Sequence, residues 1–283
     1  MRLAEIQGHI ASMSELLDIV GAMRSLAGMR VQEAQRALPG IRGYAGSMAA
    51  AIGTTLLLMP PQQSEAPAKP GRRALVLCAA EHGFVGGFNE RLIEAAAAAL
   101  GPSDALFVLG SRGAALAIER GRHAVWTQPM ATRPAGTPET INRLAAELYA
   151  RIARGEIARV EVMYGRYRQG GTPDIECHAL LPLDVASLAA APLRLPPLHD
   201  LAPQALLERL AAEYVFARLT EASVESIASE NAARFAAMES AHDNVSKKLE
   251  QLRQGERQAR QTEITTELLD LITGTEVLTN DLA

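Results

Sequence analysis

The chain has 283 residues, of which 48% are hydrophobic and 21% charged, which is enough to bury the core of one large or two small domains. Its formal net charge of −4 provides no overall basic field, so we predict no nucleic-acid partner. No stretch reaches the roughly 18 uninterrupted apolar residues of a membrane span, and we therefore predict a soluble protein without a direct membrane span.

The first predicted element is a long helix over residues 1–58. Small or apolar residues recur there at alternating spacings of three and four positions, from Leu3 to Ile52. This heptad pattern is typical of a helix that winds around a partner helix. Arg24 is the one polar residue in the row. Pro39, which removes a ladder hydrogen bond, predicts a bend in the helix without a full stop.

Strand-like and helix-like patterns alternate over residues 72–187, between Pro-rich segments at residues 59–73 and 189–203. This alternation is typical of a mostly parallel sheet with helices on its faces, as in Rossmann-like domains. The last strand is predicted to be an antiparallel edge. The predicted strands cover residues 73–80, 104–110, 123–127, 159–164 and 175–181, and the predicted helices cover residues 89–100, 111–121 and 138–153.

A second long helix is predicted over residues 204–275, with a heptad row of its own from Leu210 to Leu252. At 1.5 Å per residue it would be roughly 100 Å long, which favours a coiled coil over a compact helical bundle. The predicted fold class is α/β: a long antiparallel coiled coil of the N- and C-terminal helices with an inserted Rossmann-like α/β domain. Glu221, Asn231 and His242 interrupt the row. They indicate either control of helix register or a surface that faces another protein.

The most enzyme-like segment is the glycine-rich loop at residues 81–89, EHGFVGGFN, which follows a predicted strand. Such a loop could cradle a phosphate, but it matches neither the dinucleotide fingerprint nor the P-loop, and glycines needed for a tight turn explain it equally. His82 beside Glu81 is predicted to be a solvent-facing loop residue. The histidines have no metal-ligand spacing with Cys78 or Cys177. We therefore predict no cofactor, no metal and no catalysis by this chain alone.

Three segments of the second long helix carry a family resemblance: ASENAARFAAMESAHDN at residues 228–244, ARQTEITTEL at 259–268 and LITG at 271–274. Together they resemble the C-terminal signature of gamma subunits of F-type ATP synthases. LVLCAAEHGFVGGFN, the stretch ending in LLPL at residues 160–183, and the spacing around Ala22 and Met23 resemble the same family. The resemblance covers nearly the whole chain.

The resemblance implies a central rotor shaft, a non-catalytic subunit that couples ion flow through the membrane rotor to ATP chemistry in the beta subunits. Its coiled coil would lie inside a ring of three alpha and three beta subunits, and its α/β domain against the epsilon subunit and the c-ring. The expected location is peripheral, on the cytoplasmic face of the bacterial inner membrane. The implied partner-contact residues are Met23, Arg24, Arg30, Arg260, Gln261 and Thr265, of which the last three would face a loop of one beta subunit.

One departure from the family concerns charge, because members usually carry several more Lys or Arg in the first helix than Arg24, Arg30 and Arg36. Such divergence would suit the alternative bacterial class of F-type ATPases, some of which resemble sodium pumps. Two other hypotheses stay open at this stage. One is a Rossmann-like nucleotide-binding enzyme with helical dimerisation arms, and the other is a coiled-coil scaffold.

Overall fold

The computed structural model describes residues 3–59, 71–188 and 198–280, with side chains up to Leu269. None of the helices in these ranges is long and apolar enough to cross a membrane. The elements are α1 (Leu3–Leu56), β1 (Arg72–Cys78), α2 (Phe88–Ala99), β2 (Ala105–Leu109), α3 (Ser111–Glu119), β3 (Trp126–Gln128), η1 (Pro134–Gly136), α4 (Thr137–Ala153), β4 (Ile157–Arg166), β5 (Asp174–Leu181), α5 (Val185–Leu188) and α6 (Pro203–Asn280).

The chain divides into two compact units, and α1 and α6 contribute to both. The terminal unit consists of residues 1–25 and 236–283, and the central unit of residues 26–235. In the terminal unit Ile6, Val20, Met238 and Leu249 are buried, as expected for apolar faces of paired helices. Gln7 donates a hydrogen bond to Glu256 at 3.1 Å, which joins the two helices across the unit.

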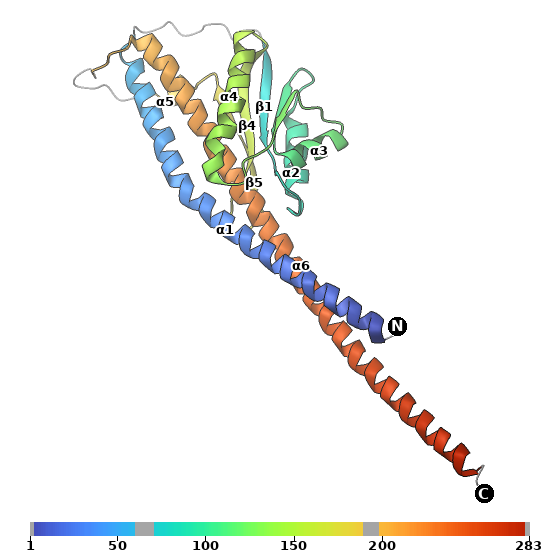
Figure 1. Ribbon diagram of the computed structural model, residues 1–283. Coiled ribbons are helices and arrows are strands. Elements are labelled where there is room, and N and C mark those ends of the chain that lie inside the picture. Colours follow the sequence, from blue (N-terminus) through green and yellow to red (C-terminus); the bar gives the residue numbers. More distant parts are fainter. Residues whose placement is uncertain (1–2, 60–70, 189–197, 281–283) are drawn as a thin grey trace. The chain divides into compact units, whose positions relative to one another are not determined.

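The central unit holds a five-stranded sheet in the order β3-β2-β1-β4-β5. β1, β2, β3 and β4 are parallel, and β5 pairs antiparallel with β4 at one edge. Because β1 is buried on both faces, its side chains alternate between two apolar cores. Ala74, Val76 and Cys78 lie in the core formed with α4, α6 and α1, whereas Leu75 and Leu77 lie in the core formed with α2 and α3. Figure 1 shows α4 on one side of β1 and α2 and α3 on the other.

Within the central unit α1 and α6 run antiparallel. A Cβ added at Gly28 would lie 3.5 Å from the ring of Phe235, while Tyr44, further along α1, donates a 2.7 Å hydrogen bond to Glu213, which is earlier in α6. The heptad row of α1 is buried here at Ala27, Ala34, Leu38, Ala45 and Ile52. The helix continues through Pro39, as predicted.

Residues 220–231 of α6 are buried on every side of the helix, including the polar ones. Val224 and Ala228 of the heptad row belong to a core that α1 and the sheet share. Outside the row, Ser226 and Ser229 donate hydrogen bonds to the carbonyls of Cys78 and Gly165, so α6 packs on both α1 and the sheet. This part of α6 is therefore an internal helix of the α/β unit as well as half of a helix pair.

The predicted fold class is confirmed: long N- and C-terminal helices pack together, and the sheet between them in sequence is mostly parallel with one antiparallel edge. The third strand begins at Trp126, later than predicted, and η1 and α5 were not expected. The Pro-rich segments lie largely outside the described residues. The domain limits 1–58, 72–187 and 204–275 stay a prediction.

Candidate functional site

The carboxyl ends of β1 and β4, where ligands bind in many parallel sheets, are occupied by α6. Cys78 at the end of β1 pairs in register with Tyr164 of β4. Ser226 donates a hydrogen bond to the Cys78 carbonyl at 2.5 Å, and Ser229 donates one to the Gly165 carbonyl at 2.7 Å. Both serines are buried. In this protein α6 therefore covers the ends of β1 and β4, beside which a Rossmann-like enzyme would bind a nucleotide.

The glycine-rich loop has structural roles for its polar groups. The Glu81 carboxylate accepts hydrogen bonds from the Ser111 backbone nitrogen at 2.9 Å and from the Ser111 hydroxyl at 2.7 Å, at the N-terminus of α3. It also accepts one from the Met130 backbone nitrogen at 2.7 Å. The Asn89 side chain accepts one from the Ala80 nitrogen at 3.0 Å, and Gly86 adopts a positive φ of 53°. These contacts favour the interpretation that the glycines are needed for a tight turn over the interpretation that the loop binds a phosphate.

A small hollow of about 150 Å³ beside this loop is lined by Glu90 and Arg112 among others. One carboxylate oxygen of Glu90 is buried without a hydrogen-bond partner. Glu90 and Arg112 bring opposite charges to this hollow, so its lining does not select a phosphate. His82 is exposed, as predicted, and the described part of the chain contains no cluster of His, Cys, Asp and Glu that could hold a metal ion.

Arg234 ties the loop to α6. Its guanidinium lies 2.6 Å from the Glu230 carboxylate and donates to the carbonyls of His82 and Gly83 at 3.3 Å and to Asn231 at 2.9 Å. The side chains of Glu230 and Arg234 are 7% and 11% exposed. Burial raises the pKa of Glu230, and the Arg234 charge opposes that rise. Glu230 and Arg234 belong to the segment that carries the family resemblance, and their contacts in the structure are internal.

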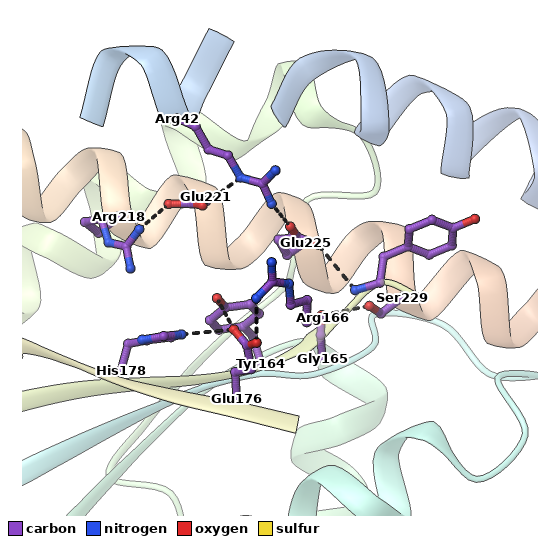
Figure 2. Close-up of polar contacts among 11 residues, drawn as sticks. Arg42, Tyr164, Gly165, Arg166, Glu176, His178, Arg218, Glu221, Glu225 and Ser229 are labelled. Carbon is purple, nitrogen blue, oxygen red and sulfur yellow. Dashed lines mark hydrogen bonds and ion pairs between the residues drawn. The ribbon is translucent and has the colours of Figure 1, made fainter. Parts of the chain in front are cut away.

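A second polar cluster joins α1, α6 and the end of β4, and we call it the Arg42 junction: Arg42, Arg218, Glu221, Glu225 and the Tyr167 backbone. Figure 2 shows Arg42 of α1 between two glutamates of α6. Its Nε donates to Glu221 Oε1 at 3.0 Å, and its Nη2 donates to Glu225 Oε1. The other oxygens accept from Arg218 at 2.5 Å and from the Tyr167 nitrogen at 3.3 Å. Burial raises the pKa of Glu225, and the Tyr167 nitrogen and the Arg42 charge act against that rise.

A third cluster lies on β4 and β5 around Glu176 (Figure 2). Glu176 accepts hydrogen bonds from Arg166 at 2.8 Å and Tyr164 at 3.0 Å, and His178 Nε2 lies 3.0 Å from it. Burial alone would raise the pKa of Glu176, but bonds from these three residues lower it to about 2. Burial, followed by the bond to Glu176, raises the pKa of Tyr164. The group is built to hold an ionised carboxylate, which fastens the edge strand to its neighbour.

The sequence-predicted partner-contact residues fall in both units. Arg260, Gln261 and Thr265 are exposed on α6 in the terminal unit, where Arg260 pairs with Glu256 at 3.0 Å and Thr265 donates to the Gln261 carbonyl at 2.8 Å. Met23 and Arg24 are half-buried in the same unit. Arg30 lies in the central unit and pairs with Glu33 at 3.6 Å. Five of the six residues thus lie in the terminal unit, on α1 and α6, and Arg30 lies in the central unit.

Large apolar side chains are exposed on both helices of the terminal unit. They are Leu16 and Ile19 on α1, and Ile264, Leu268 and Leu269 on α6. Exposed apolar residues that gather on one surface are typical of protein contacts. Sequence reasoning missed Leu16 and Ile19 because they lie outside the heptad row. Their own spacing of three positions is the signal that could have identified them.

The long helix pair, and the segment of α6 that covers the ends of β1 and β4, define a class of protein: two long paired helices with an α/β domain inserted between them in the sequence. A family model described as ATP synthase matches residues 2–278. An ATP synthase gamma chain of Streptomyces coelicolor is 30% identical over 95% of this chain and 94% of its own length. One of Geobacter sp. (strain M21) is 28% identical over 97% of this chain and 98% of its own. The chain belongs to the ATP synthase gamma-chain family.

Solved structures of ATP synthase rotors share the fold. A chain of the Euglena gracilis mitochondrial ATP synthase, from a structure of its OSCP, F1 and c-ring in rotational state 3, has a TM-score of 0.60 at 14% identity, covering 98% of this chain and 94% of its own. A chain of the central stalk and c-ring of the Tetrahymena thermophila enzyme has a TM-score of 0.57 at 16% identity, covering 79% and 99%. The predicted family, and with it the prediction of a non-catalytic subunit, is confirmed.

Proposed function

We propose that this chain is the central rotor shaft of an F-type ATP synthase, which couples ion flow through a membrane rotor to ATP synthesis or hydrolysis in a catalytic head. The observation that carries the proposal is the match to the family over residues 2–278, on a chain whose first and last helices pair antiparallel. The proposed partners are the alpha and beta subunits of the head, the epsilon subunit and the c-ring.

The mechanism is mechanical rather than chemical. An asymmetric pair of helices that turns inside a ring of three catalytic sites presents a different surface to each site in turn. ATP chemistry then belongs to the beta subunits, and this chain supplies the moving surface. A buried apolar seam and the internal segment of α6 suit such a role, because close-packed cores transmit strain rather than absorb it.

We further propose that Arg260, Gln261 and Thr265 contact a loop of one beta subunit, and that Met23, Arg24 and Arg30 are further partner-contact residues of this chain. Support comes from the exposure of the first three side chains beside exposed Ile264 and Leu268. The proposed location is peripheral, on the cytoplasmic face of the bacterial inner membrane.

The first test is co-expression with the alpha and beta subunits of the same organism. The chain should join a complex with them in single copy, and a chain that remains apart from both would refute the proposal. Addition of common nucleotides to the isolated chain in a calorimeter checks the enzyme alternative, for which saturable micromolar binding would be required.

The second test concerns the contact residues in the assembled, membrane-bound complex. Truncation before Arg260 should weaken ATP-driven ion pumping, and Thr265→Ala should lower pumping per ATP hydrolysed. Thr262→Ala is the matched control, because Thr262 is also exposed and also donates to a backbone carbonyl four residues earlier, at 3.0 Å. Unchanged pumping in the truncated complex would contradict the contact assignment. Sodium dependence of ATP hydrolysis tests membership of the alternative F-type class.

A further inference from the structure

The Arg42 junction connects three elements that are distant in the sequence. Among the described residues of the central unit, the ion pairs that join α1 to α6 are those of Arg42 with Glu221 and with Glu225. The Arg42 side chain is 46% exposed, whereas those of Glu221 and Glu225 are 11% and 4% exposed. The guanidinium thus reaches from the rim of the helix pair to carboxylates that lie inside it.

The buried row of α1 mixes the small Ala27, Ala34 and Ala45 with the larger Leu38 and Ile52. Apolar contacts of this kind have little directionality, so the polar contacts between the helices add most to the choice of register. In helix pairs a polar residue at the seam commonly sets the register, and a planar guanidinium that bonds two carboxylates is specific in both distance and direction. Arg42 provides that specificity here.

Glu225 is shared between the helix pair and the sheet. One of its oxygens accepts from Arg42 of α1, and the other accepts from the backbone nitrogen of Tyr167, which directly follows β4. A displacement of α1 along α6 would break the first bond, and a displacement of α6 from the end of β4 would break the second. Arg218 holds the neighbouring Glu221 from the other side at 2.5 Å.

We propose that the Arg42 junction is the fastening point that carries load between the helix pair and the α/β part of the central unit, with Arg42 and Glu225 as positioning residues for rotary coupling. This inference rests on the proposed function of the chain as a rotor shaft. It assigns to Arg42 a role that the heptad pattern does not reveal, because Arg42 lies next to the row residue Ile41 and outside the row itself.

The test uses the complete membrane-bound complex and measures ions pumped per ATP hydrolysed. Arg42→Ala should assemble and hydrolyse ATP but pump less per ATP, by about twofold or more. Arg42→Lys should restore part of the loss, because an ammonium keeps the charge but cannot bond both carboxylates as a fork. Glu225→Gln, which retains an acceptor for Tyr167, should show the same loss to a smaller extent.

Arg36→Ala is the matched control, since Arg36 is an exposed arginine of the same helix for which no ion pair is described. A complex with Arg42→Ala that pumps as efficiently as one with Arg36→Ala would overturn the proposal. A general loss of stability would lower both the amount of assembled complex and its ATP hydrolysis. Loss of the Arg42 junction alone should lower the ratio of ions pumped to ATP hydrolysed.

Hydrogen exchange of the isolated full chain decides the matter if Arg42→Ala fails to assemble. The Tyr167 amide should exchange about tenfold faster in Arg42→Ala than in the unsubstituted chain, while amides of the terminal unit should be unchanged. Equal exchange at Tyr167 would overturn the proposal. If the unsubstituted chain itself joins no complex, the proposed function fails, and the exchange result still reports on the junction.

Discussion

Removal of the Arg234 guanidinium should destabilise the central unit strongly, because it leaves a buried carboxylate without its counter-charge. Glu230 is 7% exposed and Arg234 is 11% exposed, so solvent cannot replace the lost partner. Breaking a buried ion pair from one side costs about 3–5 kcal/mol. We expect Arg234→Met to lose about that much free energy of unfolding at neutral pH.

The loss should depend on pH in a direction that follows from Glu230. Burial already raises its pKa in the folded protein, and removal of the opposing Arg234 charge raises it further. A carboxyl group whose folded pKa lies above its unfolded value loses stability as the pH rises through the folded pKa. The deficit of Arg234→Met should therefore grow from acidic to neutral pH. Below about pH 4 it should shrink to the 1–2 kcal/mol of the lost carbonyl contacts.

Urea unfolding followed by fluorescence measures this effect, because the single tryptophan, Trp126, lies in β3 of the central unit beside Phe107. The matched control is Arg143→Met, which breaks the same kind of i,i+4 pair with Glu139 where the side chains are 64% and 74% exposed. It should cost less than about 0.5 kcal/mol. Glu230→Gln combined with Arg234→Met should recover part of the loss. A deficit below about 1 kcal/mol, or one equal at pH 5 and pH 8, would refute the reasoning.

Three further predictions follow from other contacts. A Cβ at Gly113 of α3 would lie 2.1 Å from the Cβ of Ala79, the first residue after β1, so Gly113→Ala should cost about 3 kcal/mol in urea unfolding. Gly8→Ala, with open space around it, should be neutral or stabilising by up to about 1 kcal/mol, and the opposite order would contradict the packing. Glu176→Gln should lower the free energy of unfolding by about 1 kcal/mol at pH 7, allowing for the partial exposure of Glu176. Because hydrogen bonds outweigh burial and lower the pKa of Glu176 to about 2, this contribution should vanish as the pH falls from about 4 to 2. A difference from the unsubstituted chain that stays constant over this range would count against the prediction. Burial raises the pKa of Cys78 to about 12, and partial burial with Glu161 nearby raises that of Cys177 to about 11. Iodoacetamide at pH 7 should therefore react slowly with exposed Cys177 and with Cys78 only after unfolding, and rapid labelling of Cys78 in the folded chain would be unexpected.

The sequence was sufficient to predict the helix pair and the sheet because both produce regular patterns. The rows from Leu3 to Ile52 and from Leu210 to Leu252 identify a buried stripe on each long helix, and the alternation of strands and helices identifies a mostly parallel sheet. Both kinds of pattern depend on neighbours a few positions apart. Both patterns can therefore be recognised in the sequence without knowledge of the tertiary structure.

The polar contacts could not be predicted in the same way. Arg42 and Glu221 are separated by 179 positions, and a heptad row indicates which face is buried without naming its partner. Ser226 and Ser229 look like residues of a solvent-facing helix, yet both are buried against the sheet. A clue was present in residues 220–231, where small residues such as Ala222 and Ala228 occur on every side of the helix. That composition is typical of a helix packed from more than one direction.

Because α6 lies across the carboxyl ends of β1 and β4, its attachment to the sheet does not respond to ligand concentration in the way that a bound small molecule would. A sheet of this kind usually holds a diffusible molecule there, whose occupancy rises and falls with its concentration. Here the occupant is covalently continuous with the rest of the chain, so its effective concentration is fixed by connectivity and cannot be diluted. The binding of α6 to the ends of β1 and β4 therefore does not depend on the concentration of any metabolite.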